Sequence, residues 1–263
     1  MYAFELHKAD SVANAAALLA KTGGKPLAGG QSLVAAMKMR LAVPGALVDL
    51  SGVPELKGIR KEGDAIVIGA MTRHAEVAAS DIVKSAIPAL AALAEGIGDR
   101  QVRNMGTLGG ALANNDPAAC YPAAVLGLGA TVTTNKRKIA ADDFFRGMYE
   151  TALGDGELIT SVSFPIPKKA AYVKFPQPAS RFALVGVFVA QTSSGMRVAV
   201  TGAAPSVHRS KQMEQALANS FTADAAKAVK IDASGLNGDL HGSPAYRAHL
   251  VSVLTARAVT AAG

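Results

Sequence analysis

The stretch Pro26-Leu27-Ala28-Gly29-Gly30-Gln31-Ser32-Leu33 decides the fold of this chain, together with a second stretch that begins Arg103-Asn104-Met105-Gly106-Thr107-Leu108-Gly109-Gly110 and runs on through 111–117. Both stretches place glycines beside residues that form hydrogen bonds. Glycine allows the backbone to approach a ligand closely and to adopt positive φ. Successive backbone N–H groups in such turns form concavities that bind phosphate. Two of them predict a ligand with more than one phosphate, held from two sides, although ordinary tight turns are also rich in glycine.

Neither stretch fits the commonest phosphate-binding motifs. The dinucleotide fingerprint G-x-G-x-x-G is absent from both, because their glycines are spaced G-G and G-x-x-G-G. A Walker loop needs Gly-Lys followed by Ser or Thr, whereas Gly24-Lys25 is followed by Pro26. The ligand is therefore not expected to sit in a Rossmann or P-loop fold.

Length and hydropathy predict a globular chain of two or three subdomains. The 263 residues can bury a large core, and the mean hydropathy is +0.24. The longest apolar stretch, 122–132, is well short of the roughly 20 residues that cross a bilayer. The first residues include Glu5, Lys8 and Asp10 and contain no long apolar segment. We therefore expect a cytoplasmic protein without a membrane span.

The cysteine and histidine content argues against a metal site in this chain. Cys120 is the only cysteine, so neither an intrachain disulfide nor a cysteine-ligated iron–sulfur cluster can form. No two of the five histidines are three or four residues apart, which excludes a helical pair of ligands. No metal ligands are expected, and a redox metal would have to come from another chain.

The formal net charge of +7 leaves two interpretations open. Nucleic-acid binding is one of them. The basic residues are scattered, however, and their one short cluster, Lys136-Arg137-Lys138, has the pattern of an exposed hairpin tip. The charge therefore favours an anionic cofactor or acidic partner subunits.

Local patterns predict alternating helices and strands, and thus an α+β fold. Ser11 is a candidate N-cap for a helix that Gly23 ends, and Pro88 should break or kink a helix over 80–96. Pro165 and Pro167 mark a boundary between the earlier elements and those that follow. Strands are expected over 47–50, 65–71, 126–134, 158–164, 184–192 and 196–202, and late helices over 210–219, 222–229 and 246–261.

The two glycine-rich stretches, in this order and with Ile68-Gly69-Ala70-Met71-Thr72-Arg73-His74 between them, resemble the flavoprotein medium subunits of molybdenum hydroxylases. This family includes carbon monoxide, xanthine and aldehyde dehydrogenases, and the resemblance covers essentially the whole chain. It implies a bilobal FAD-binding domain of the vanillyl-alcohol-oxidase type, followed by a small C-terminal domain with a three-stranded antiparallel sheet and helices. The implied divisions are 1–55 and 56–167 for the two FAD-binding subdomains and 168–263 for the C-terminal domain.

The resemblance also implies which residues contact a noncovalently bound FAD. From the first stretch these are Leu27, Ala28, Gly29, Gly30, Gln31, Ser32 and Leu33. From the second they are Arg103, Asn104, Thr107, Leu108, Gly109, Gly110, Ala111, Asn114 and Asp116. The N–H groups of both stretches are expected to bind the pyrophosphate. Asp116 has an alternative role in an Asx turn before Pro117.

Further expected contacts come from outside the two stretches. Cys120 stands where many relatives carry an Asp or Glu close to the cofactor. Either a water replaces that carboxylate here or the contact is absent. The alternative role of Cys120 is that of a small buried residue that fills space in the core. Leu158 and Ile159 match an aliphatic pair that covers the cofactor, although core packing explains them equally well. Lys174 is expected to place a cation near the flavin N1–C2 carbonyl, and Phe182 to lie near the ring.

The implied function is that of an electron-transfer subunit. Electrons would pass from a large molybdopterin subunit through the [2Fe–2S] clusters of a small subunit to the FAD, and then to NAD, a quinone, a carrier protein or oxygen. A heterotrimer that doubles into a dimer of trimers is expected, and no catalytic acid or base is required here. The alternatives are a stand-alone FAD-dependent oxidase or reductase and a flavin- or nucleotide-binding module without redox function. Substrate and acceptor are left open.

Overall fold

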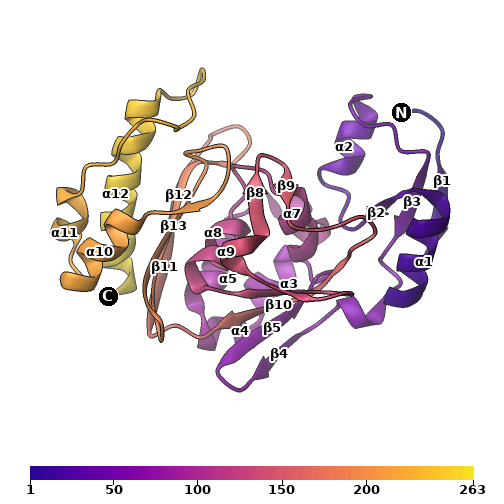
Figure 1. Ribbon diagram of the computed structural model, residues 1–263, viewed down its shortest axis with the longest axis horizontal. Coiled ribbons are helices and arrows are strands. Elements are labelled where there is room, and N and C mark those ends of the chain that lie inside the picture. Colours follow the sequence, from indigo (N-terminus) through magenta and orange to yellow (C-terminus); the bar gives the residue numbers. More distant parts are fainter.

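A computed structural model describes all 263 residues and arranges the strands in three main sheets that follow one another along the chain (Figure 1). Each sheet has its own buried core. The first core holds nine buried residues, the second 33 and the third 17. None of the helices is both long enough and apolar enough to cross a membrane.

The N-terminal lobe is a small parallel sheet in the order β1-β3-β2. Ser11 caps its first helix by accepting from the Asn14 N–H at 3.2 Å, and Gly23 ends that helix in the left-handed conformation. Its nine-residue core includes Met71 and Leu158 from later in the chain. Its elements are β1 (Glu5–Lys8), α1 (Val12–Thr22), β2 (Lys25–Leu27), α2 (Leu33–Lys38), β3 (Ala46–Asp49) and the 3₁₀-helix η1 (Pro54–Leu56).

The middle lobe is an antiparallel sheet in the order β4-β5-β10-β6-β7, covered by helices. Its strands are β4 (Ile59–Glu62), β5 (Ala65–Gly69), β6 (Thr131–Thr134), β7 (Lys138–Ala140) and β10 (Ile159–Pro165). Its helices are α3 (His74–Ala79), α4 (Asp81–Ala86), α5 (Pro88–Glu95), α6 (Arg100–Met105), α7 (Leu108–Asn114), α8 (Tyr121–Leu128) and α9 (Ala141–Phe144). A hairpin of β8 (Phe145–Gly147) and β9 (Glu150–Thr151) follows α9.

One expected strand in this lobe is wrong. The run 126–134 is not a single strand, because its first residues belong to the buried helix α8. Pro122 lies in the first turn of that helix, and Gly129, with a φ of 63°, ends it. Only Thr131–Thr134 is extended. By contrast, Pro88 separates α4 from α5 as expected, and the basic cluster forms the β6–β7 turn.

The C-terminal domain is an antiparallel sheet of three long strands, extended by a short fourth one. Successive residues of its central strand face opposite cores: Val187 and Val189 belong to the third core, and Phe188 and Ala190 to the second. The elements are β11 (Lys169–Pro176), β12 (Ala183–Thr192), β13 (Gly195–Thr201), β14 (His208–Arg209), α10 (Lys211–Asn219), α11 (Ala223–Ala228) and α12 (Pro244–Ala262).

Helices cover both faces of this last sheet (Figure 1). The helices α10 and α12 pack on one face, and α5 and α8 of the middle lobe contact the other. Arg197 fixes this junction, because its guanidinium donates to the Leu126 carbonyl at the end of α8 and to both carboxylate oxygens of Asp142, each at 2.9 Å. A cation at a helix C-terminus also complements the helix dipole.

Candidate functional site

The two glycine-rich segments lie against each other. A Cβ atom added at Gly29 would be 2.1 Å from the Met105 carbonyl oxygen and 2.7 Å from the Gly106 Cα. A Cβ atom at Gly110 would be 3.5 Å from that of Ala28. The neighbouring segment by itself therefore requires glycine at position 29. The expectation that the two segments form one site agrees with this contact.

The first segment carries a row of unused donors. No backbone N–H from Ala28 to Leu33 donates to an acceptor within the protein; the next one, that of Val34, donates to the Gly30 carbonyl at 3.1 Å. Gly30 adopts a φ of +71°, and the Ser32 side chain makes no capping bond to α2. Successive unpaired N–H groups on residues that are partly or fully exposed are suited to bind an anion.

The second segment is built differently. Most of its backbone N–H groups are already paired, so the expected donor set from Thr107 to Gly110 is wrong in this respect. The pairs are Leu108 to the Thr72 carbonyl at 3.0 Å, Gly109 to the Ala70 carbonyl at 2.8 Å and Gly110 to the Thr107 hydroxyl oxygen at 3.2 Å. The cause is that α7 begins here, capped by Thr107 and packed on the end of β5.

Polar groups without protein partners remain around the second segment. The Thr107 N–H and the side-chain amides of Asn104 and Asn114 make no hydrogen bond in the protein. Asp116 accepts from the Ala118 N–H at 2.8 Å, which is the Asx turn considered as its alternative role. Its other carboxylate oxygen accepts from the Tyr149 hydroxyl at 3.4 Å.

The Arg103 side chain is occupied by contacts within the protein, and its expected contact with FAD stays a prediction. Its guanidinium donates to the carbonyls of Ile97 and Gly98 at 3.1 and 3.2 Å and to the Glu95 carboxylate at 2.9 Å. The side chain is 10% exposed. Arg103 therefore holds the turn after α5 against α6, which leads into the second glycine-rich segment.

Lys174 and Cys120 meet at the same turn. The Lys174 ammonium donates to the Gly96 carbonyl at 2.6 Å, to the Arg181 carbonyl at 2.7 Å and to the Cys120 Sγ at 3.5 Å. These contacts use all three of its hydrogens, and its expected place near the flavin N1–C2 carbonyl stays a prediction. Cys120 is 5% exposed, as the filler interpretation requires.

The remaining residues that were expected to contact FAD lie partly on the surface and partly in the core. Phe182 is 46% exposed, at the end of the β11–β12 turn, where Arg181 donates to the Gly98 carbonyl at 3.1 Å. Leu158 and Ile159 are both buried, the first in the N-terminal core and the second in the middle core. Core packing accounts for both of them.

One residue of this region was given no role by sequence reasoning. The His74 ring lies beneath the second segment, so that a Cβ atom at Gly106 would be 2.5 Å from its Nε2. Burial, reinforced by the charge of Arg103, lowers the pKa of His74 to about 4. Its Nδ1 is buried without a partner. The only feature of the sequence that could have indicated a role for His74 was its place in the stretch 68–74.

Two family models together cover almost the whole chain. Residues 2–167 match the FAD binding domain in molybdopterin dehydrogenase, and residues 170–262 match the CO dehydrogenase flavoprotein C-terminal domain. The chain belongs to the family of FAD-binding medium subunits of molybdenum hydroxylases. The expected fold, a bilobal FAD-binding domain followed by a small α+β domain, is confirmed with it.

Individual relatives of this medium subunit match it over nearly their full length. The carbon monoxide dehydrogenase medium chain of Hydrogenophaga pseudoflava is 36% identical over an alignment of 277 positions, and the match covers 98% of this chain and 96% of the relative. The nicotine 6-hydroxylase medium subunit of Paenarthrobacter nicotinovorans is 36% identical over an alignment of 253 positions, and the match covers 91% of this chain and 89% of the relative.

Solved structures agree with these relatives. The carbon monoxide dehydrogenase of Hydrogenophaga pseudoflava that lacks the Mo-pyranopterin moiety of its cofactor has a chain that superimposes with a TM-score of 0.90 at 36% identity, covering 99% of this chain and 97% of that one. Quinoline 2-oxidoreductase from Pseudomonas putida 86 gives 0.89 at 29% identity, covering 99% and 97%.

The residues of this medium subunit fit the cofactor of its family. The pyrophosphate of FAD needs N–H donors and close backbone approach, and the segment from Ala28 to Leu33 presents unpaired N–H groups together with the Ser32 hydroxyl. Asn104 and Asn114 add amides that suit hydroxyl or phosphate oxygens. The complexes of this family carry their molybdopterin and iron–sulfur cofactors on partner subunits.

Proposed function

We propose that this chain binds one FAD noncovalently across its two glycine-rich segments, takes electrons from the [2Fe–2S] clusters of a small subunit and passes them to an external acceptor. The row of unpaired N–H groups from Ala28 to Leu33, packed against the second segment, is the observation that carries the proposal. The FAD supplies the redox chemistry, while the protein binds and orients it.

The chain's own residues have three tasks in this proposal. The N–H groups of 28–33, with the Ser32 hydroxyl, hold the pyrophosphate. Thr107, Asn104 and Asn114 provide polar groups of the second segment, and Gly29 allows the two segments to meet. The turn after α5, held by Arg103 and Lys174, fixes how the C-terminal domain closes on the middle lobe.

The proposal also covers the domain division, the partner subunits and the compartment of the complex. The three sheets support a division into 1–55, 56–167 and 168–263, with the cofactor between the first two parts. The partners are a large molybdopterin subunit and a small [2Fe–2S] subunit in a heterotrimer. A single buried cysteine suits a reducing compartment, and we assign the complex to the cytoplasm.

The test compares the complete complex with the isolated chain loaded with FAD. Each is mixed without oxygen with carbon monoxide, an aldehyde, a purine or an aromatic heterocycle, and the flavin absorbance is followed. We expect one substrate to bleach the flavin of the complex and none to bleach that of the isolated chain. Bleaching in the isolated, metal-free chain would instead establish the stand-alone oxidase or reductase.

A further inference from the structure

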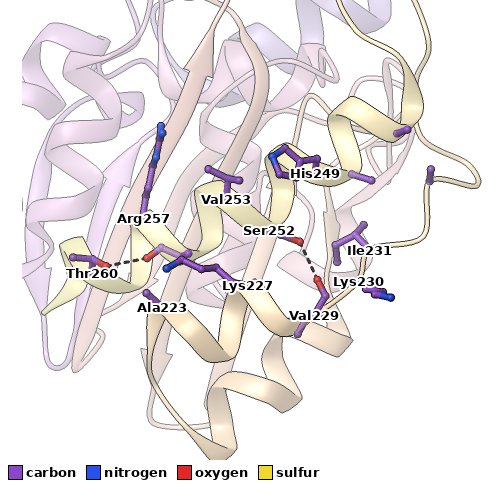
Figure 2. Close-up of a pocket in the computed structure, with 14 residues that line it drawn as sticks. Ala223, Lys227, Val229, Lys230, Ile231, His249, Ser252, Val253, Arg257 and Thr260 are labelled. Atoms are coloured by element: carbon purple, nitrogen blue, oxygen red, sulfur yellow. Dashed lines mark hydrogen bonds between the residues drawn. The ribbon is translucent and has the colours of Figure 1, made fainter.

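A groove of about 780 Å³ runs along the outer face of the C-terminal domain (Figure 2). One wall is α12, and the other is α11 with the segment that follows it. The Ser252 hydroxyl donates to the Val229 carbonyl at 3.0 Å and fastens the two walls together. The floor of the groove is apolar, formed in part by Val229, Ile231, Val253 and Ala256.

Four basic side chains stand at this groove, and no carboxylate lines it. They are Lys227, Lys230, His249 and Arg257. Lys227 has an exposed ion-pair partner, Asp224 at 3.0 Å, whereas the other three form no ion pair in the chain. An apolar floor beside Lys230 and Arg257, two cations without an ion-pair partner, is complementary to an amphipathic anion.

The dimensions indicate what kind of anion fits. The residues of α12 that line the groove extend from Ala245 to Thr260, which is about 22 Å at the rise of an α-helix. His249 and Arg257 are about 12 Å apart along the same helix. A compact ligand would not reach both ends. A polypeptide segment would, and the alanines at 248 and 256 allow a backbone to come close.

We propose that this groove is the docking site for an acidic amphipathic segment of a partner subunit in the same complex. The apolar face of the segment packs on the floor, and its carboxylates face Lys230 and Arg257, in the manner of a helix bound in a groove. The chain belongs to a family of multi-subunit enzymes, so a partner subunit of the same complex can carry this segment.

The position of the groove separates docking from electron transfer. α12 packs on one face of β11 and β12, while α5 and α8 contact the opposite face of that sheet. The groove is thus on the far side of the C-terminal domain from the glycine-rich segments (Figure 1). A segment bound there anchors the partner without covering the proposed flavin site, so the docking proposal can fail or hold independently of the proposed electron path.

Charge-reversal variants of the chain, assembled with its partners, test the proposal. Lys230→Glu and Arg257→Glu should each weaken assembly by about tenfold and reduce its dependence on ionic strength. Lys61→Glu, an exposed lysine on β4 with no ion pair, is the matched control and should change assembly by less than about twofold. Thermal unfolding and flavin content, measured in parallel, should stay at wild-type values because these side chains are exposed.

A footprint on the unmodified protein provides the second readout. Lys227 and Lys230 are acetylated in the isolated chain and in the complex, and their modification rates are compared by peptide mass spectrometry. We expect both to react at least about fivefold more slowly in the complex. Equal rates in the two forms, assembly unaffected by both charge reversals, or a small molecule found in the groove by native mass spectrometry would each overturn the proposal.

Discussion

Replacement of Gly29 by alanine tests whether contact between the two glycine-rich segments, and not ligand approach alone, requires glycine. The new methyl group would lie 2.1 Å from the Met105 carbonyl oxygen, although Cβ contacts below 3.0 Å essentially never occur, so the segments must separate by about 0.9 Å. Overpacking of this kind costs about 1–3 kcal/mol. If that cost falls on the closed arrangement that binds FAD, affinity drops between about 5-fold and 150-fold.

Titration of the FAD-free protein with FAD, followed by quenching of flavin fluorescence, measures this loss. Gly45→Ala is the control: it has the same effect on the unfolded chain, but a Cβ atom there meets nothing within 4 Å. It should bind FAD as the wild type does. If Gly29→Ala binds FAD within twofold of wild type and unfolds at the same temperature, the segments do not need their close contact, and the reasoning fails.

Three further predictions concern buried polar groups. Unfolded His74 takes up a proton below about pH 6.5, but the folded residue does so only near its pKa of about 4, so stability should fall as the pH drops through this window. His74→Phe should flatten that fall in urea unfolding. The hydrogen bond from Arg137 lowers the pKa of Glu157 to about 2, so its contribution is present above pH 4.5 and lost towards pH 2; Glu157→Gln should remove this acid dependence. Cys120→Asp should cost about 1–3 kcal/mol more in a Lys174→Met background than in wild type, because the carboxylate then lacks its cation; equal losses in the two backgrounds would contradict the contact.

Sequence reasoning succeeded where local chemistry and family pattern coincide. Ser11 and Gly23 bound α1 because a cap and a left-handed residue act within a few positions of the chain. The order of the two glycine-rich stretches was enough to place the chain in its family, which the whole-length matches confirm. Pro88 ended a helix for a reason that is likewise local.

The remaining features depend on how side chains and segments pack, which residue type and spacing do not indicate. An apolar run such as 126–134 is compatible with a buried helix or a buried strand. The helix packs so closely on Phe188 that a Cβ atom at Gly127 would lie 2.7 Å from that ring, and Pro122 and Gly129 mark its ends. The directions taken by Arg103 and Lys174 depend on carbonyls of the turn after α5. No spacing in the sequence indicates that these carbonyls converge there.

The N-terminal core can be completed only late in the synthesis of the chain. Seven of its nine buried residues come from the first 56 positions, but Met71 and Leu158 complete it. A ribosome adds about 5–20 residues each second, so the interval between the synthesis of Leu56 and that of Leu158 is about 5–20 s. Throughout this time the nascent N-terminal sheet lacks part of its interior. The lobe that carries the first glycine-rich segment is thus the first to be synthesised, yet it cannot be the first to finish folding.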